Sequence, residues 1–200
     1  MRLFSYVCSM NTELFFSILE SFSFVAGIFF IFLQVKQVSW MWHINNLCCF
    51  AALVVFAHQQ LWASMGLNIY YIVVGVIGVI AWKKEKAESK AILVRKMNGI
   101  TWVLSVLAFL VGFGVLFYIL KITHDPAPVA DALVGASGAV GMVWLLRCYI
   151  QNWAAWLFSD VISLYLCLSS GLYFMSALYL AYIIVAIVGW REWRVKGIQL

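Results

Sequence analysis

Runs of about 20 apolar residues recur along this chain, and they restrict its fold more than any other feature of the sequence. A hydrocarbon core about 30 Å thick is crossed by about 20 apolar residues in helical form. With 66% apolar and only 10% charged residues, the chain has too few charges to cover the surface of a soluble domain. Seven runs are expected to span the membrane, at about residues 13–34, 38–58, 61–82, 98–120, 131–150, 152–169 and 171–190. The sequence therefore predicts an all-α membrane protein, in which residues 1–200 form a single transmembrane domain of seven transmembrane helices.

The basic residues predict how the chain is inserted. When seven spans alternate across the bilayer, eleven of the 13 lysines and arginines fall on one side, and only Arg2 and Lys121 fall on the other. Basic residues concentrate on the cytoplasmic side of membrane proteins. We therefore expect the N-terminus outside and the C-terminus in the cytoplasm. Contact with the lipid bilayer accounts for the net charge of +5, so no nucleic-acid partner is expected.

The sequence lacks the motifs of the common energy-coupled and catalytic sites. It contains no Gly-rich phosphate loop, no nucleophile motif and no His-Glu-x-x-His pair. Its five cysteines have no metal-ligand spacing, and most fall inside apolar runs, where packing is their usual role. We therefore expect a protein that is not an enzyme and that holds no cofactor or metal. A homo-oligomer is compatible with the sequence.

An internal repeat is visible when the sequence is displaced along itself until Trp42 falls on Trp153. This repeat displacement also brings other rare residues together, in the pairs Gly27 and Gly138, Lys36 and Arg147, Gly78 and Gly189, and Trp82 and Trp193. Pairing Trp42 with Trp156 and Asn46 with Asp160 needs a slightly longer displacement, which compensating loop changes of three residues would explain. We expect 3+1+3 parallel repeats at about residues 13–82 and 131–193, joined by a linker and connector helix at 83–120. A substrate site is expected at the repeat interface.

Polar and aromatic residues at helical spacing are candidates for that substrate site. The third predicted helix carries Gln60, Asn68 and Tyr71 on one stripe, and its repeat mate carries Tyr179 and Tyr182 on the corresponding stripe. Two such stripes facing each other suit a small polar ligand. For Asn68 and Tyr179, hydrogen bonding between packed helices is the alternative interpretation.

The strongest candidate is an aspartate inside the sixth apolar run. Trp153, Trp156 and Asp160 lie three and four residues apart on one helix face, and Trp42 lies one turn before Asn46 on the second helix. Burying a carboxylate in hydrocarbon without a partner costs free energy, so the presence of Asp160 at this depth requires an explanation. An indole beside a carboxylate suits a flat cation. An interfacial tryptophan belt for Trp153 and helix pairing for Asn46 are the alternative interpretations.

These stretches resemble the Pnu family of bacterial vitamin transporters. The resemblance rests on "NWAAWLFSDVIS", "GLYFMSALYLAYIIVAIVGWREW" and "HQQLWASMGLNIYYIVVGVIGVIAW", and it covers about residues 20–193. Its most specific part is the W-x-x-W-x-x-x-[D/N] run at Trp153, Trp156 and Asp160, which in that family belongs to the substrate site. The resemblance implies site roles for three further residues, Trp42, Asn46 and Gln60.

The resemblance also implies a fold and an activity. It implies a SWEET-like fold in the bacterial inner membrane and vitamin uptake by facilitated diffusion, with phosphorylation in the cytoplasm trapping the vitamin. Nicotinamide riboside is the favoured substrate. Thiamine is the alternative, because both vitamins are cations and because Asn68 stands where the riboside carriers are associated with glutamine; riboflavin ranks third. A membrane scaffold without transport activity is a different alternative, in which polar residues would lie along an outer face and not between the repeats.

Overall fold

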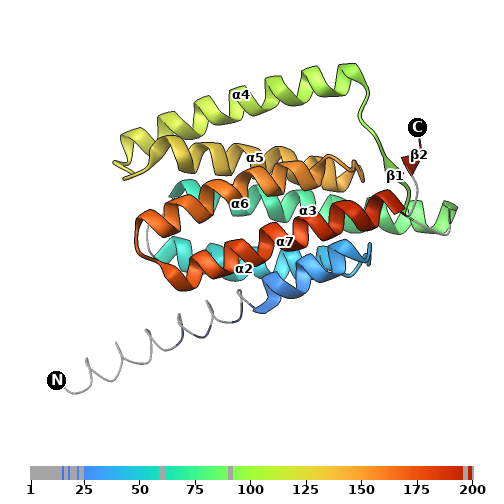
Figure 1. Cartoon of the computed structure of the whole chain (residues 1–200), viewed down its shortest axis with the longest axis horizontal. Helices are drawn as coiled ribbons and strands as arrows, with labels where there is room; N and C mark the ends of the chain where they lie inside the picture. The colour runs from blue at the N-terminus through green and yellow to red at the C-terminus, as the bar shows by residue number, and fades with distance from the viewer. Residues whose placement is uncertain are drawn as a thin grey trace.

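The described part of the chain is a bundle of long helices. The computed structural model describes residues 15, 18, 22, 25–58, 62–89, 92–195 and 198–199. Its elements are a helical segment Val25–Val35, α2 (Met41–His58), α3 (Trp62–Ser89), β1 (Val94–Arg95), α4 (Gly99–Ile122), α5 (Pro128–Leu146), α6 (Asn152–Ser169), α7 (Tyr173–Val195) and β2 (Ile198–Gln199). Figure 1 shows the helices running along the long axis of the bundle.

Five of these helices are long and apolar enough to cross a membrane, namely α2, α3, α4, α5 and α7. The α6 helix has the same length as α2, 18 residues. It is less apolar because its buried residues include Asn152, Ser159, Asp160 and Ser163. Part of the first predicted span lies outside the described residues. The prediction of a helical, multi-pass membrane protein is confirmed.

The helix bounds follow from local sequence chemistry. The α6 helix has the predicted bounds, 152–169, whereas α3 continues to Ser89, past its predicted end at residue 82. Lysine, glutamate and alanine favour this extension, and Lys84 lies 3.9 Å from Glu88 one turn later. The α4 helix begins after Asn98, whose side chain accepts from the Thr101 backbone N–H at 2.8 Å. The α5 helix begins at Pro128, because proline suits the first turn.

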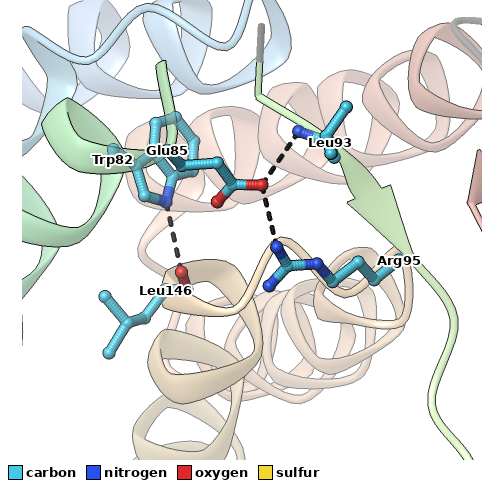
Figure 2. A network of polar contacts seen from close by, with 5 residues as sticks. All are labelled: Trp82, Glu85, Leu93, Arg95 and Leu146. Atoms are coloured by element: carbon cyan, nitrogen blue, oxygen red, sulfur yellow. Dashed lines mark hydrogen bonds and ion pairs between the residues drawn. The ribbon is translucent and has the colours of Figure 1, made fainter. Parts of the chain in front are cut away.

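The all-α prediction missed a pair of two-residue strands at one end of the bundle. β1 pairs in parallel with β2, and it also contacts the turn between α5 and α6. There the Arg95 N–H donates to the Cys148 carbonyl at 2.9 Å, and the Ile150 N–H donates to the Arg95 carbonyl at 3.0 Å. Glu85 of α3 accepts from the Leu93 N–H at 3.2 Å and from the Arg95 guanidinium at 3.0 Å (Figure 2). These bonds fasten the linker to both halves of the chain.

The α4 helix is the least enclosed part of the bundle. The α2 helix packs against α3, α6 packs against α7, and α5 contacts α3, α4 and α6. The α4 helix rests mainly on α5, touches α3 only slightly and has no buried residue. In Figure 1 it runs along one edge of the bundle, reached from α3 through β1. It therefore connects the two halves without entering the core.

Elements related by the repeat displacement have matching bounds. The displacement carries both bounds of α2 onto the bounds of α6, and it carries the start of α3 onto the start of α7. It also relates two residues with left-handed backbone conformation, since Gln37 and Cys148 both have φ of 57°. The longer displacement, suggested for Trp42 and Trp156, does not relate these bounds. By the bounds of α2 and α6, Trp42 corresponds to Trp153.

Four buried tryptophans make matching contacts at the same displacement. Trp42 packs edge-on against Trp82, with ring centroids 5.5 Å apart and an interplanar angle of 89°. Trp153 packs against Trp193 in the same way, at 5.4 Å and 86°. Indole rings bury a large area, so these two pairs form much of the core.

Each half also bonds to the other half through a tryptophan. The Trp82 indole N–H donates to the Leu146 carbonyl at the end of α5, at 3.2 Å (Figure 2). The Trp193 indole N–H donates to the Val35 carbonyl at the end of the Val25–Val35 segment, at 3.3 Å. The repeat displacement also carries Val35 onto Leu146. The third helix of each half therefore holds the end of the first helix of the other half.

Candidate substrate site

A cavity of about 280 Å³ lies between the two halves of the chain. The Val25–Val35 segment and α3 contribute from the first half, and α5, α6 and α7 contribute from the second. The volume is near the lower end of the range of small-molecule pockets, about 300 Å³. Six residues predicted for the site line the cavity: Tyr71, Trp153, Trp156, Asp160, Tyr179 and Tyr182.

Asp160 supplies the one carboxylate among the described residues that line the cavity. Asp160 as a whole residue is only 8% exposed, and Ser159 and Ser163 lie close to it on α6 and also line the cavity. No lysine or arginine occurs among the described residues that line the cavity. In a site without water, a carboxylate attracts a cation far more strongly than it does at the protein surface. The cavity is therefore suited to a ligand that carries positive charge.

Two indoles form an aromatic wall beside the carboxylate. Trp153 is 2% exposed, and Trp156 lies one turn later on the same helix face. The indole nitrogens of both residues are buried, and among the described residues neither has a hydrogen-bond acceptor. Buried donors normally find a partner. A ligand in the cavity could supply the acceptors, as well as a flat ring to pack against the indoles.

Two tyrosine hydroxyls lie opposite glycines. The Tyr71 hydroxyl lies against Gly138, and the Tyr182 hydroxyl is 3.4 Å from the position that a Cβ would take at Gly27. The repeat displacement relates the two tyrosines to each other and the two glycines to each other. The lack of a side chain at Gly138 therefore leaves room for the Tyr71 phenol of the other half, whereas the Tyr182 phenol lies at an ordinary contact distance from Gly27.

Gln34 also lines the cavity, and the sequence interpretation missed it. It is 1% exposed, and its amide donates to the Asn152 side chain at 3.0 Å, across the two halves. Asn152 in turn donates to the Tyr149 carbonyl, so it is held in place. The only sequence signal was a polar residue at the end of an apolar run. At the corresponding position of the second half the residue is Leu145, so the repeat did not single it out.

Three of the predicted residues lie away from this cavity, and one lies outside the described residues. Trp42 is fully buried against Trp82 and the backbone of Gly78. Asn46 accepts from Asn45 at 3.4 Å beside Gly75. Asn68 donates to the Ser64 carbonyl of its own helix at 2.9 Å. Gln60 lies outside the described residues. None of the first three lines the cavity around Asp160.

Comparison with known proteins identifies the family. The family model described as "Nicotinamide mononucleotide transporter" matches residues 17–195, which is most of the chain. The chain belongs to this family. The expectation of a Pnu-type transporter that is not an enzyme is thereby confirmed.

Two relatives of this family member carry the name "Nicotinamide riboside transporter PnuC". They come from Escherichia coli (strain K12) and Shigella flexneri, and each is 24% identical to this chain over 166 residues, covering 70% of both chains. A solved structure, "Crystal structure of the Vitamin B3 transporter PnuC", matches with a TM-score of 0.72 and 21% identity. It covers 96% of this chain and 85% of that chain. This structural likeness shows a shared fold.

Proposed function

We propose that this chain carries nicotinamide riboside across the bacterial inner membrane by facilitated diffusion, with Asp160 as the countercharge of the pyridinium ring. The observation that carries the proposal is the buried carboxylate in a cavity with two indoles and without a described lysine or arginine in its lining. A permanent cation would neutralise the carboxylate and pack its ring against Trp153 or Trp156. Thiamine is also a cation, and the names of the relatives favour the riboside.

The polar lining supports binding of the ribose. The indole N–H groups of Trp153 and Trp156 are donors without described acceptors, and Tyr71 and Tyr182 supply hydroxyls. Gln34 is a further contact in this proposal, because part of its amide is free to bond a ligand hydroxyl. Trp42, Asn46, Gln60 and Asn68 stay predicted site residues. Alanine variants of each test whether another transport conformation brings them to the ligand.

The proposed transport needs no coupling to ATP or to an ion gradient. The sequence has no nucleotide-binding motif, and Asp160 is assigned to the ligand. A cationic substrate still responds to membrane potential, at about 2.3 kcal/mol per elementary charge for each 100 mV. An inside-negative potential therefore favours uptake without any coupling ion.

The matching bounds and contacts support a finer description of the fold. We propose that residues 1–200 form one transmembrane domain of 3+1+3 parallel repeats, SWEET-like, with α4 as the connector. The eleven-to-two distribution of basic residues supports a cytoplasmic C-terminus and an external N-terminus. A homo-oligomer is compatible with this arrangement.

Titration of purified protein with three vitamins tests the substrate and the role of Asp160 together. Quenching of tryptophan fluorescence would be followed with nicotinamide riboside, thiamine and riboflavin. We expect the riboside to bind tightest. Truncating one member of a buried charge pair costs roughly 2 to 5 kcal/mol, so Asp160→Ala should weaken binding by at least one order of magnitude. Asp160→Asn should have a smaller effect if hydrogen bonding carries part of the interaction.

The matched control is Glu88→Ala, which removes an exposed carboxylate of α3 that lies outside the cavity lining. It should leave the affinity unchanged. If thiamine binds more tightly than nicotinamide riboside, thiamine and not the riboside is the substrate. Unchanged affinity in Asp160→Ala would show that Asp160 has a structural role and would overturn its assignment.

A further inference from the structure

A second cavity, distinct from the substrate site, opens beside α4. Its volume is about 570 Å³, and it lies between α4, α5 and α3. Tyr70 forms its α3 wall, Ala108 and Gly112 its α4 wall and Val140 its α5 wall. It shares no lining residue with the cavity around Asp160. We refer to it as the α4 groove.

The α4 groove runs lengthwise along antiparallel helices. Thr101 in the first turn of α4 and Arg147 at the end of α5 belong to one end of the lining, and Gly112 lies near the Ala136 side chain farther along. A hydrogen bond from the Trp144 indole to the Ser105 hydroxyl, at 2.9 Å, fixes this register. At 1.5 Å per residue, Thr101 to Gly112 spans about 16 Å. That length is about half of a 30 Å hydrocarbon core, or one leaflet.

The groove changes from polar to apolar along this length. Arg147, Tyr149 and Thr101 lie at one end, whereas the rest of the lining is mostly apolar and includes the small residues Ala108, Gly112 and Ala136. The α4 helix also begins at the polar end, where its dipole favours an anion. A charged head group would match the polar end of the groove, and one hydrocarbon chain would match its apolar length.

The charge at the polar end has no protein partner among the described residues. Arg147 is exposed. The two ion pairs found among the described residues join Lys84 to Glu88 and Arg95 to Glu85, so neither involves Arg147. The lining of the groove contains no carboxylate. A guanidinium bonds phosphate oxygens strongly and often through two N–H groups.

We propose that the α4 groove binds an anionic phospholipid, with its phosphate on Arg147 and one acyl chain along α4 and α5. The occupant has to be an amphiphile because α4 is an apolar helix without a buried residue, whereas Arg147 at the polar end of the groove is charged. The anionic class follows from Arg147 and from the many basic residues predicted for the same side of the membrane. Such a lipid fills the space that α4 leaves open, and it ties the connector helix to α5. This proposal does not depend on the identity of the transported vitamin.

Native mass spectrometry of the purified, delipidated full chain tests the proposal. Phosphatidylglycerol and phosphatidylcholine with identical acyl chains would be added in turn, and the retained adducts counted. We expect retention of phosphatidylglycerol over phosphatidylcholine. Because a hydrogen bond to a charged group is the stronger kind, Arg147→Gln should reduce phosphatidylglycerol retention by about tenfold.

Two further variants separate the head group from the chain. Ala108→Leu fills the groove without touching Arg147, and it should lower retention of both lipids. Arg191→Gln removes an exposed arginine of α7 that does not line the groove, and it should change neither. Vitamin binding should persist in every variant, which verifies folding. Equal retention of the two lipids by the wild type would overturn the proposal, as would an unchanged adduct in Arg147→Gln. A change of oligomeric state in Ala108→Leu with no lipid adduct in the wild type would assign the groove to a second copy of the chain instead.

Discussion

Alanine substitutions at Gly189 and Gly78 provide a matched test of how the core tryptophans are used. A Cβ at Gly189 would lie 2.5 and 2.6 Å from Cζ2 and Cζ3 of Trp153, and a Cβ at Gly78 would lie 2.5 and 2.6 Å from Cε2 and Cε3 of Trp42. Ordinary contacts of a Cβ begin near 3.4 Å. The nearest ring carbons, Cη2 of Trp153 and Cδ2 of Trp42, would lie closer still, so each indole must move by about 1 Å to accept the methyl group. The two substitutions impose almost the same geometric demand.

The cost to stability should be similar for the two variants. Each displaced indole already packs edge-on against another buried tryptophan, Trp193 or Trp82, so neither can move freely. Overpacking of a close-packed core typically costs about 1–3 kcal/mol. We expect Gly189→Ala and Gly78→Ala to lower the thermal midpoint in detergent by similar amounts. The measurement is fluorescence-detected size exclusion after heating.

The two variants should differ in ligand binding. Trp153 lines the cavity around Asp160, whereas Trp42 does not. Displacement of an aromatic face that a cation packs against loses about 0.5 to 2 kcal/mol, which corresponds to roughly a 2- to 30-fold weaker affinity. We expect this loss in Gly189→Ala and a near wild-type affinity in Gly78→Ala, measured by tryptophan quenching with nicotinamide riboside. Equal losses in both variants would refute the distinction between the two tryptophans and would bring Trp42 to the ligand as well. An intact affinity in Gly189→Ala despite a lowered midpoint would refute the role of Trp153.

The remaining predictions concern stability, energetics and topology. Trp82→Phe removes the indole hydrogen bond to Leu146, and Trp193→Phe removes the indole hydrogen bond shared between the Gln34 and Val35 carbonyls, so both should destabilise the protein by at least about 0.5 to 1.5 kcal/mol, seen as lowered thermal midpoints. Glu85→Gln weakens a partly exposed ion pair with Arg95, so its cost should stay within about 1 kcal/mol and shrink in high salt; a large, salt-independent loss would show a role beyond the pair. In proteoliposomes at zero potential, a pH or sodium gradient should drive no uphill accumulation of unmodified riboside, and accumulation would demonstrate coupling. C-terminal reporter fusions should be active in the cytoplasm, and activity only outside would reverse the proposed orientation.

The position of the α6 helix and the helix face that carries Asp160 could be predicted from the sequence. Apolar run length placed the α6 helix at 152–169, and helical spacing placed Trp153, Trp156 and Asp160 on one face. Both predictions depend on local chemistry, because the hydrocarbon thickness fixes helix length and the helical period fixes which residues share a face. The pairs of rare residues were visible for the same reason, since they recur along the chain at one fixed displacement.

Only the tertiary structure decided which residues share a cavity. Trp42 and Trp153 are related by the repeat displacement and make equivalent ring contacts, yet only Trp153 lines the cavity with Asp160. Gln34 joins that cavity, whereas its repeat counterpart Leu145 packs in the core. A helix that is apolar on every side carries no pattern that tells which face meets which neighbour. The neighbours are set by the packing of whole helices across the two halves, including the tryptophan bonds to Leu146 and Val35, and such contacts between distant residues leave no local trace in the chain.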